Sequence, residues 1–124
     1  MQEFVAIAAG GAVGAVLRYW VSHGVYLLVG RGFPYGTLAV NVVGSLAMGM
    51  LFVLLIERLA TGPAVRAFVL IGLLGAFTTF STFSIETLNL IESGETVKAL
   101  LNALLSVILC VAAAAFGLLL GRQL

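Results

Sequence analysis

The stretch that determines the fold is the last apolar run, residues 97–120, which reads VKALLNALLSVILCVAAAAFGLLL. Its only charged side chain is Lys98, near its beginning. A transmembrane α-helix needs about 20 mostly apolar residues, because the hydrocarbon core is about 30 Å thick and a helix rises about 1.5 Å per residue. The run can therefore cross a bilayer, and in lipid it must be helical because no water is present to bond the backbone.

Three more runs of the same kind precede it, over residues 4–29, 35–56 and 64–91. The breaks between runs hold both prolines, Pro34 and Pro63, where helices are expected to stop. All four runs are continuously apolar rather than alternating, which argues against a β-barrel. The sequence therefore predicts an all-α membrane protein, with residues 1–124 forming a single four-helix transmembrane domain.

The composition excludes several classes of protein. Of 124 residues, 62% are hydrophobic and 9% are charged, whereas a soluble domain has about 25% charged residues. Four spans leave room for short loops only, so we expect no soluble catalytic domain and no enzyme. The net charge of +1 argues against nucleic acid as a partner. A single cysteine and a single histidine exclude an intrachain disulfide, a thiolate metal cluster and a His-pair metal site.

The charges in the loops give little preference for one orientation in the membrane. An even number of spans puts Arg58, Arg66 and Arg122 on one side, and Arg31 and Lys98 on the other. Positive charges in short loops normally set the orientation, and here they are nearly balanced. Either a single charge still sets the orientation, or copies of the chain insert into the membrane in both orientations, which is called dual topology. The first residues carry an acid rather than a positive charge, so we interpret the first run as a permanent span and not as a signal peptide.

Small residues four apart predict close helix packing. Such pairs occur at Gly10 and Gly14, at Ser45 and Gly49, and at Gly117 and Gly121. A lone bundle of four short helices is too thin to enclose a wet path and still pack its core. We therefore expect an oligomer, and a two-fold dimer is the commonest form.

The chemistry of the chain is concentrated in the third run, where residues 72–87 read GLLGAFTTFSTFSIET. Five hydroxyl side chains and two phenylalanines, Phe80 and Phe83, fall between Thr78 and Ser84. Each hydroxyl can bond back to its own helix, but so dense a cluster predicts a break in the helix, which is tolerated at membrane depth only where it is buried or lines a cavity. Phenylalanine ring edges are weakly positive, so the pattern suits a small anion that loses water as it moves.

Polar residues elsewhere extend this interpretation. Asn41 lies within the second run, and Asn102 and Ser106 are four apart on the fourth. Arg18 lies within the first run, where a charge needs a partner or a wet cavity, unless its side chain reaches the membrane surface. We interpret Cys110 as a small packing residue.

The strings GAFTTFSTFS at 75–84 with Glu86 and Thr87, Gly36-Thr37-Leu38 with Asn41 and Gly44, and Gly10-Gly11 with Gly14 and Arg18 resemble the motifs of the Fluc/CrcB fluoride channels. The resemblance covers the whole chain. It implies a channel that exports fluoride passively across the bacterial inner membrane, built as an antiparallel, dual-topology homodimer with two fluoride pathways.

The resemblance also implies roles for individual residues. Phe80 and Phe83 would line the pore, and Asn41 would orient them. The polar track would include Thr82, Ser106, Ser81 and Ser84. Arg18 would lie near the vestibule, and Glu86 would be the acid beyond the phenylalanines. The backbone carbonyls of Gly75 and Thr78 would bind a central structural Na⁺, two from each subunit. Some members of the family carry a tyrosine where Asn102 aligns, so the contacts at that position stay open.

Three other functions compete with this one. A small proton-coupled multidrug antiporter needs a carboxylate in its first helix, where this chain has Arg18, and Glu86 is the only candidate. A non-transporting assembly subunit explains the glycines but not the hydroxyl and phenylalanine cluster. An intramembrane serine protease needs a Ser–His pair, but His23 lies near the interface and no Gly-x-Ser-x-Gly string is present. The residues alone indicate a polar ion path in a small helical oligomer, and only the resemblance selects fluoride.

Overall fold

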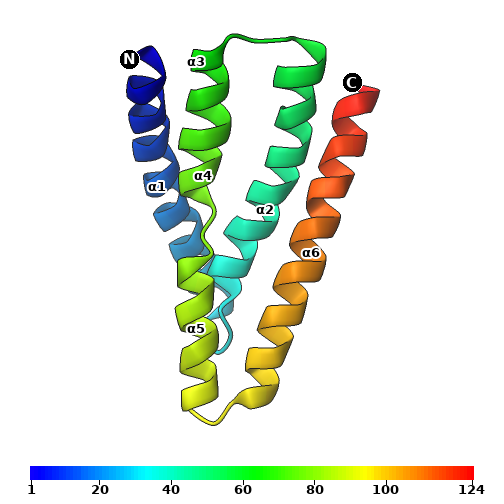
Figure 1. Ribbon diagram of the computed structural model, residues 1–124. Coiled ribbons are helices and arrows are strands. Elements are labelled where there is room, and N and C mark those ends of the chain that lie inside the picture. Colours follow the sequence, from blue (N-terminus) through cyan, green and yellow to red (C-terminus); the bar gives the residue numbers. More distant parts are fainter.

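The structure, a computed structural model, describes residues 1–124 and contains helices and short loops only (Figure 1). The first helix is α1 (Gln2–Val29), and the second is α2 (Tyr35–Phe52) with its π-helical extension η1 (Val53–Arg58). The third stretch consists of α3 (Pro63–Arg66), the π-helix η2 (Ala67–Leu74), α4 (Gly75–Phe77) and, after a gap, α5 (Ser81–Glu92). The last helix is α6 (Thr96–Gln123).

Four stretches are long and apolar enough to cross a membrane, which confirms the predicted all-α class: Gln2–Val29, Tyr35–Arg58, Pro63–Glu92 and Thr96–Gln123. Their ends differ from the predicted runs 4–29, 35–56, 64–91 and 97–120 by at most three residues. In the first and in the last stretch, only 11% of the 18-residue segment with the highest hydropathy is buried within the chain. Exposed apolar surface on this scale is typical of helices covered by lipid or by a partner chain.

The helices begin and end where the sequence contains turn residues. Pro34 directly precedes α2, and Pro63 is the first residue of α3, where its missing N–H costs nothing. Gly30 and Gly94 end helices with φ angles of 84° and 82°, a conformation that glycine adopts without strain. Both chain termini and the loop between η1 and α3 lie at the same end of the bundle (Figure 1).

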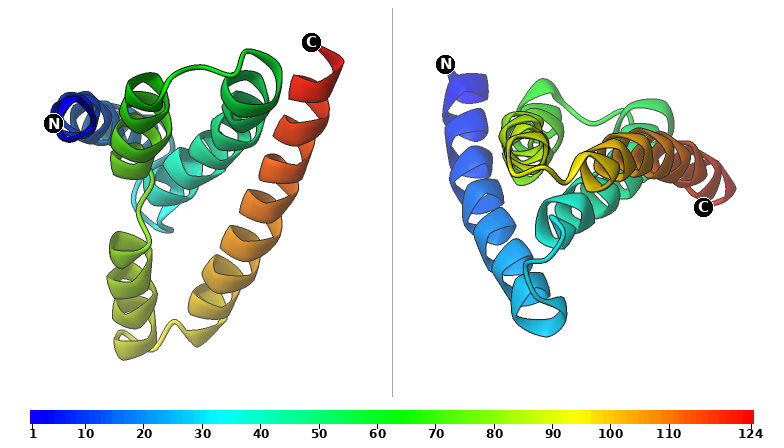
Figure 2. Two further views of the ribbon diagram at one scale, coloured as in Figure 1. Left: turned by 45° about the horizontal axis from the view of Figure 1, so that its top comes forward. Right: turned by 90° about the horizontal axis from the view of Figure 1, so that it is seen from below.

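The helices pack as two pairs that meet at α2 (Figure 2). In one pair, α1 lies against η2, and a Cβ atom at Gly14 would meet the carbonyl oxygen of Leu73. In the other pair, α2 lies along α6, and a Cβ atom at Gly49 would meet the carbonyl oxygen of Ala114. The same close approach to a neighbouring backbone occurs at Gly10, Gly72, Gly117 and Gly121. The predicted glycine pairs therefore serve packing within one chain.

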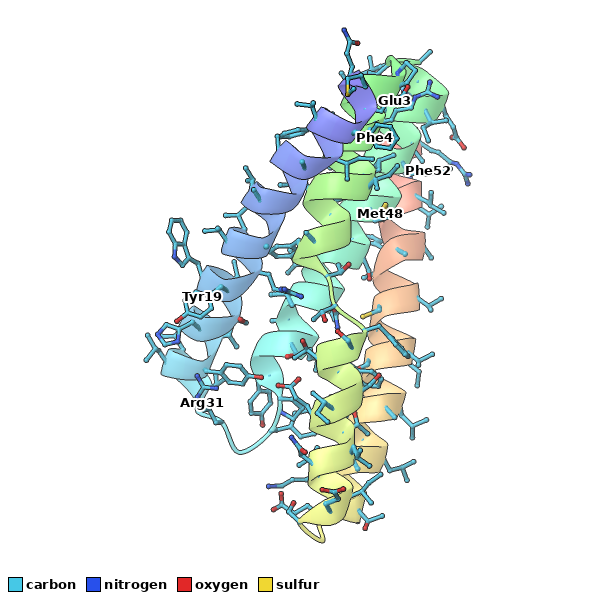
Figure 3. All side chains as sticks on the ribbon, turned by 60° about the vertical axis from the view of Figure 1, so that its left-hand side comes forward. Glu3, Phe4, Tyr19, Arg31, Met48 and Phe52 are labelled. Atoms are coloured by element: carbon cyan, nitrogen blue, oxygen red, sulfur yellow. The ribbon has the colours of Figure 1, made fainter.

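Charged side chains at the two ends of the bundle are partly neutralised. Arg122 lies 3.6 Å from the carboxylate of Glu57, and Lys98 lies 3.2 Å from that of Glu95. Arg58 donates to the carbonyl oxygen of Arg122 at 3.0 Å, and thereby caps the last turn of α6. Figure 3 shows Glu3 near one end of the bundle and Arg31 near the other, with apolar side chains projecting outward between them.

The glycine contacts on α1 predict a position-dependent effect of adding one methyl group. We expect Gly14→Ala to lower the free energy of unfolding by about 1–3 kcal/mol, because its Cβ would overlap the backbone of η2. Thermal unfolding in detergent measures the change. Gly24→Ala is the matched control, because it lies on the same helix with no neighbouring atom within 4 Å and should gain up to about 1 kcal/mol from helix propensity. Equal shifts for both variants would contradict the packing argument.

Candidate functional site

The third stretch is interrupted between Phe77 and Ser81. Thr78 ends α4 in an extended conformation, with φ −89° and ψ 160°, and α5 begins at Ser81. The interruption lies within the hydroxyl and phenylalanine cluster, where the sequence predicts a break. Backbone groups are left without helical partners at such a gap, so the side chains around it must supply them.

Asn41 on α2 supplies two of these partners. Its Oδ1 accepts the N–H of Thr79 at 2.7 Å, and its Nδ2 donates to the carbonyl oxygen of Thr79 at 2.9 Å. The amide thus replaces, for one residue, the two hydrogen bonds that a continuous helix would make. Because Thr79 directly precedes Phe80, the pair also fixes where the first ring leaves the chain. Sequence reasoning did not single out Thr79, although an amide facing a predicted break is the signal that could have found it.

Two of the clustered hydroxyls bond to their own backbone. Thr78 Oγ1 donates to the carbonyl oxygen of Leu74 at 3.0 Å, and Ser84 Oγ donates to that of Phe80 at 2.9 Å. Their protons are therefore committed and are not available to an ion. Thr78 and Ser84 therefore use their hydroxyls to bond the helix backbone. This arrangement differs from that expected for side chains of a polar track.

Thr79 and Thr82 form a cap at the start of α5. Thr79 Oγ1 accepts the N–H of Thr82 at 3.2 Å and donates to Thr82 Oγ1 at 3.1 Å, while Ser81 Oγ lies 3.5 Å away. The hydroxyl proton of Thr82 has no acceptor in the structure, so it remains free to donate.

Four consecutive backbone carbonyls at the break, those of residues 75–78, accept no hydrogen bond, and two of them belong to Gly75 and Thr78. In a continuous helix these two would accept the N–H groups of Thr79 and Thr82, but those groups donate instead to Asn41 Oδ1 and Thr79 Oγ1. No other hydrogen bond reaches either carbonyl. These two carbonyls are the ones that the family resemblance implies as Na⁺ ligands, and neutral carbonyl oxygens are ligands that a hard cation accepts.

A groove of about 390 Å³ runs beside the break, between α2, α5 and α6. It brings together four of the predicted pathway residues, Asn41, Phe80, Phe83 and Ser106. The full lining is Asn41, Gly44, Ser45, Met48, Thr78, Thr79, Phe80, Phe83, Ser106, Val107, Cys110, Val111 and Ala114. The predicted pathway residues Ser81, Thr82 and Ser84 lie outside this lining.

The two phenylalanines form a tilted pair on one side of the groove. Their ring centroids are 5.3 Å apart, and their planes meet at 46°. Phe80 is 77% exposed, whereas Phe83 is half-buried. A ring with this exposure in so apolar a chain is covered either by lipid or by a partner chain.

Ser106 lies on α6 across the groove. It is only 8% exposed, and its buried Oγ has no hydrogen-bond partner. Buried polar groups are nearly always partnered, so this hydroxyl is an unusual feature of the groove wall. One turn earlier, the buried Asn102 donates to Thr87 Oγ1 at 2.8 Å, and Thr87 donates to the carbonyl oxygen of Phe83 at 2.8 Å. The sequence did not predict the contacts of Asn102, and the structure shows that this residue links α6 to α5 by a hydrogen bond.

The two predicted charges lie away from the groove lining and do not pair with each other. Glu86 Oε2 accepts the hydroxyl of Tyr26 at 3.1 Å, while its buried Oε1 has no partner. Glu86 borders a second cavity of about 460 Å³ that also contains Arg31 and Lys98. Arg31 stacks over the Tyr26 ring at 4.4 Å. Arg18 is half-buried and makes no ion pair or hydrogen bond.

Residues 5–118 match the sequence pattern of a family described as "CrcB-like protein, Camphor Resistance (CrcB)". A protein of Magnetococcus marinus called fluoride-specific ion channel FluC is 59% identical over 116 residues, 94% of each chain. A protein of the same name from Geobacter sulfurreducens is 48% identical over 124 residues, 100% of each chain. One from Methylococcus capsulatus is 58% identical over 119 residues, which are 96% of this chain and 52% of that one, so this chain spans about half of its length. These matches cover nearly the whole chain, which therefore belongs to the CrcB-like protein family.

Proposed function

We propose that this protein is a fluoride channel, a multi-pass protein of the bacterial inner membrane through which fluoride leaves the cytoplasm down its gradient. Relatives that are 44–59% identical over nearly the full chain carry the name fluoride-specific ion channel FluC. The observation that carries the proposal is the groove beside the broken helix, where two phenylalanine rings face a buried hydroxyl that has no partner.

The groove offers a small anion weak contacts only. The free proton of Ser106 and the positive ring edges of Phe80 and Phe83 replace part of the ion's water. The unused N–H of the Asn41 amide adds a further donor, because one N–H of that group is committed to Thr79. No full positive charge lines the groove. An ion can therefore enter and leave without being trapped, which conduction requires.

A second copy of the chain completes the path in this proposal. The exposed Phe80 ring and the largely exposed apolar helices favour burial against a partner. The near balance of loop charges allows that partner to insert in the opposite orientation. The result is an antiparallel, dual-topology homodimer with two pathways, and the break in each third stretch then lies near the middle of the membrane.

The freed carbonyls of Gly75 and Thr78 are the proposed ligands of a structural Na⁺ at the dimer interface, with two carbonyls from each protomer. The residues fit this ion, because both carbonyls have lost their helical donors to Asn41 and Thr79. When bound, the cation supplies a fixed positive charge that raises the local concentration of anions. Arg18, which has no partner in the chain, and Glu86 are the proposed charges of the outer pathway.

The ring pair gives a direct test of the path. We expect Phe80→Ile and Phe83→Ile each to slow fluoride efflux from liposomes at least about tenfold, because an aliphatic side chain offers no positive edge to the ion and a tenfold change corresponds to about 1.4 kcal/mol in the barrier. A fluoride electrode measures the efflux. Phe116→Ile, on the exposed side of α6, is the control and should conduct normally. Unchanged flux in both groove variants would refute the pore role.

The amide of Asn41 has a structural function that can be separated from conduction. We expect Asn41→Leu to lower the free energy of unfolding by about 2–4 kcal/mol, because the N–H and carbonyl of Thr79 both lose their partners. Denaturation in detergent followed by circular dichroism measures the loss. Asn89→Leu replaces an exposed asparagine on α5 and should change stability little. Equal stability of Asn41→Leu and the parent would show that the break is held by other contacts.

The antiporter alternative is tested at Glu86, since the buried and unpartnered Oε1 is the one observation that favours it. In a channel, fluoride efflux needs no proton gradient, and Glu86→Gln retains passive flux. In an antiporter, a proton gradient drives transport, and the same substitution abolishes it. Flux measured with equal pH on both sides, and then with a pH step, distinguishes the two. Transport that occurs only with the pH step would overturn the channel proposal.

A further inference from the structure

We propose that Arg31 is the anion-attracting charge of an outer mouth of the ion path, where its guanidinium draws small anions from solution toward the groove. The outer mouth is the cavity of about 460 Å³ that is lined by the loop between α1 and α2, by α5 and by the beginning of α6. The inference rests on the proposed function, because it takes the groove to be the ion path, and it adds an entrance to that path.

The outer mouth continues from the groove along α5 and opens to water. Phe83 lines the groove and Glu86 lines the outer mouth, and residues three apart lie on the same side of a helix. Only 3 of the 11 residues that line the outer mouth are hydrophobic, against 7 of 13 in the groove. Arg31 is exposed in the loop between two membrane-spanning stretches, Gln2–Val29 and Tyr35–Arg58, and Figure 3 shows it near one end of the bundle. The outer mouth therefore has a charged rim outside the hydrocarbon core.

Arg31 is the one basic side chain of the outer mouth whose charge is not neutralised. Two basic and two acidic side chains line this cavity. Lys98 and Glu95 form an ion pair at 3.2 Å and largely cancel each other, whereas Arg31 makes no ion pair. The remaining acid, Glu86, is half-buried, whereas Arg31 is exposed. An anion that approaches from water therefore meets the guanidinium first, and charges at the entrance of a cleft raise the rate at which opposite charges arrive.

Tyr26 holds Arg31 and Glu86 by different parts of its side chain. The guanidinium carbon of Arg31 lies 4.4 Å from the centre of the Tyr26 ring, and such a contact orients a cation while leaving its charge in place. The hydroxyl of the same ring donates to Glu86 Oε2 at 3.1 Å, so a neutral donor bonds this carboxylate. The ring itself is closely packed, because a Cβ atom at Gly36 would overlap Tyr26 Cε2. Arg31 thus keeps its charge for ions in solution.

Salt screening distinguishes an electrostatic role of Arg31 from a structural one. The full chain is placed in liposomes of phosphatidylcholine, whose headgroups carry no net charge, and a fluoride electrode records efflux at fluoride concentrations low enough for entry to limit the rate. We expect Arg31→Gln to slow efflux about two- to fivefold in about 10 mM potassium gluconate, where charges act over about 30 Å. In about 1 M salt, where they act over about 3 Å, the variant should approach the rate of the parent.

A second substitution restores the charge of the outer mouth at a different position. Glu95→Gln releases Lys98 from its ion pair and so adds one uncompensated positive charge to the same cavity. In the Arg31→Gln background, we expect Glu95→Gln to recover most of the lost rate at low salt, although it does not rebuild the contact with Tyr26. Arg31→Lys, which keeps the charge, should keep the salt dependence of the parent.

Arg122→Gln is the matched control, because it removes the same charge from the other end of the chain, where the side chain does not line the outer mouth. Its efflux at low salt should stay close to that of the parent. An equal loss in Arg122→Gln and Arg31→Gln would mean that the total charge of the protein, and not the outer mouth, sets the rate, and the inference would be wrong.

Three further results would overturn the inference. A loss in Arg31→Gln that is the same at both salt concentrations shows that Arg31 acts through packing. An unchanged rate at low salt shows that anions do not enter past Arg31. A double variant with Glu95→Gln that stays as slow as Arg31→Gln shows that charge in this cavity does not matter. Failure of the proposed function looks different, because the parent protein then passes no fluoride at either salt concentration, and the inference falls with it.

Discussion

The structure depends on the paired hydrogen bonds between the Asn41 amide and the backbone of Thr79. In a soluble protein, water could satisfy an N–H and a carbonyl at a broken helix. In lipid no such substitute exists, and each unpaired group costs several kcal/mol. One amide on α2 removes that cost at the point where the third stretch opens. The groove, the ring pair and the start of α5 all lie next to this contact.

The same contact links the conformation of the chain to its electrostatics. Because Thr79 donates to Asn41 and Thr82 donates to Thr79, the carbonyls of Gly75 and Thr78 lose their usual donors. A break that exposed equal numbers of donors and acceptors would be electrically neutral. Here side chains satisfy the N–H groups of Thr79 and Thr82, whereas the N–H groups of Phe80 and Ser81 make no hydrogen bond. The free carbonyls of Gly75 and Thr78 are the groups to which we assign the proposed Na⁺, and a cation bound there would raise the concentration of anions nearby.

Much of this arrangement was readable in the sequence. Four apolar runs separated by Pro34 and Pro63 predicted the four helices to within three residues, because the length of a span and the chemistry of turns act locally. The break was also predicted, because hydroxyls and Gly75 crowd one short segment. The side chain that bonds the backbone at the break was less predictable. Asn41 lies 38 residues from Thr79, and nothing local says which backbone group an amide will reach.

Other features depended on three-dimensional packing. Five similar hydroxyls in the third stretch divide into two that bond to their own backbone and others that cap α5 or stay partly free, and the difference comes from the path of the chain. The glycine pairs were visible, but only the packed helices show that they bring backbones together within one chain. Tyr26 gave no sequence signal for its bond to Glu86, because the two lie 60 residues apart.

The ion pairs at the two ends of the bundle have a consequence for the energy of the molecule in a polarised membrane. Arg122 with Glu57 at one end, and Lys98 with Glu95 at the other, leave both ends close to neutral. Moving one elementary charge through a potential of 100 mV changes its energy by about 2.3 kcal/mol. The electrical work of turning the molecule over depends on the difference in charge between its two ends, and each ion pair lowers that end's contribution. The voltage across a living membrane therefore distinguishes an upright from an inverted copy only through the charges that these ion pairs leave uncompensated.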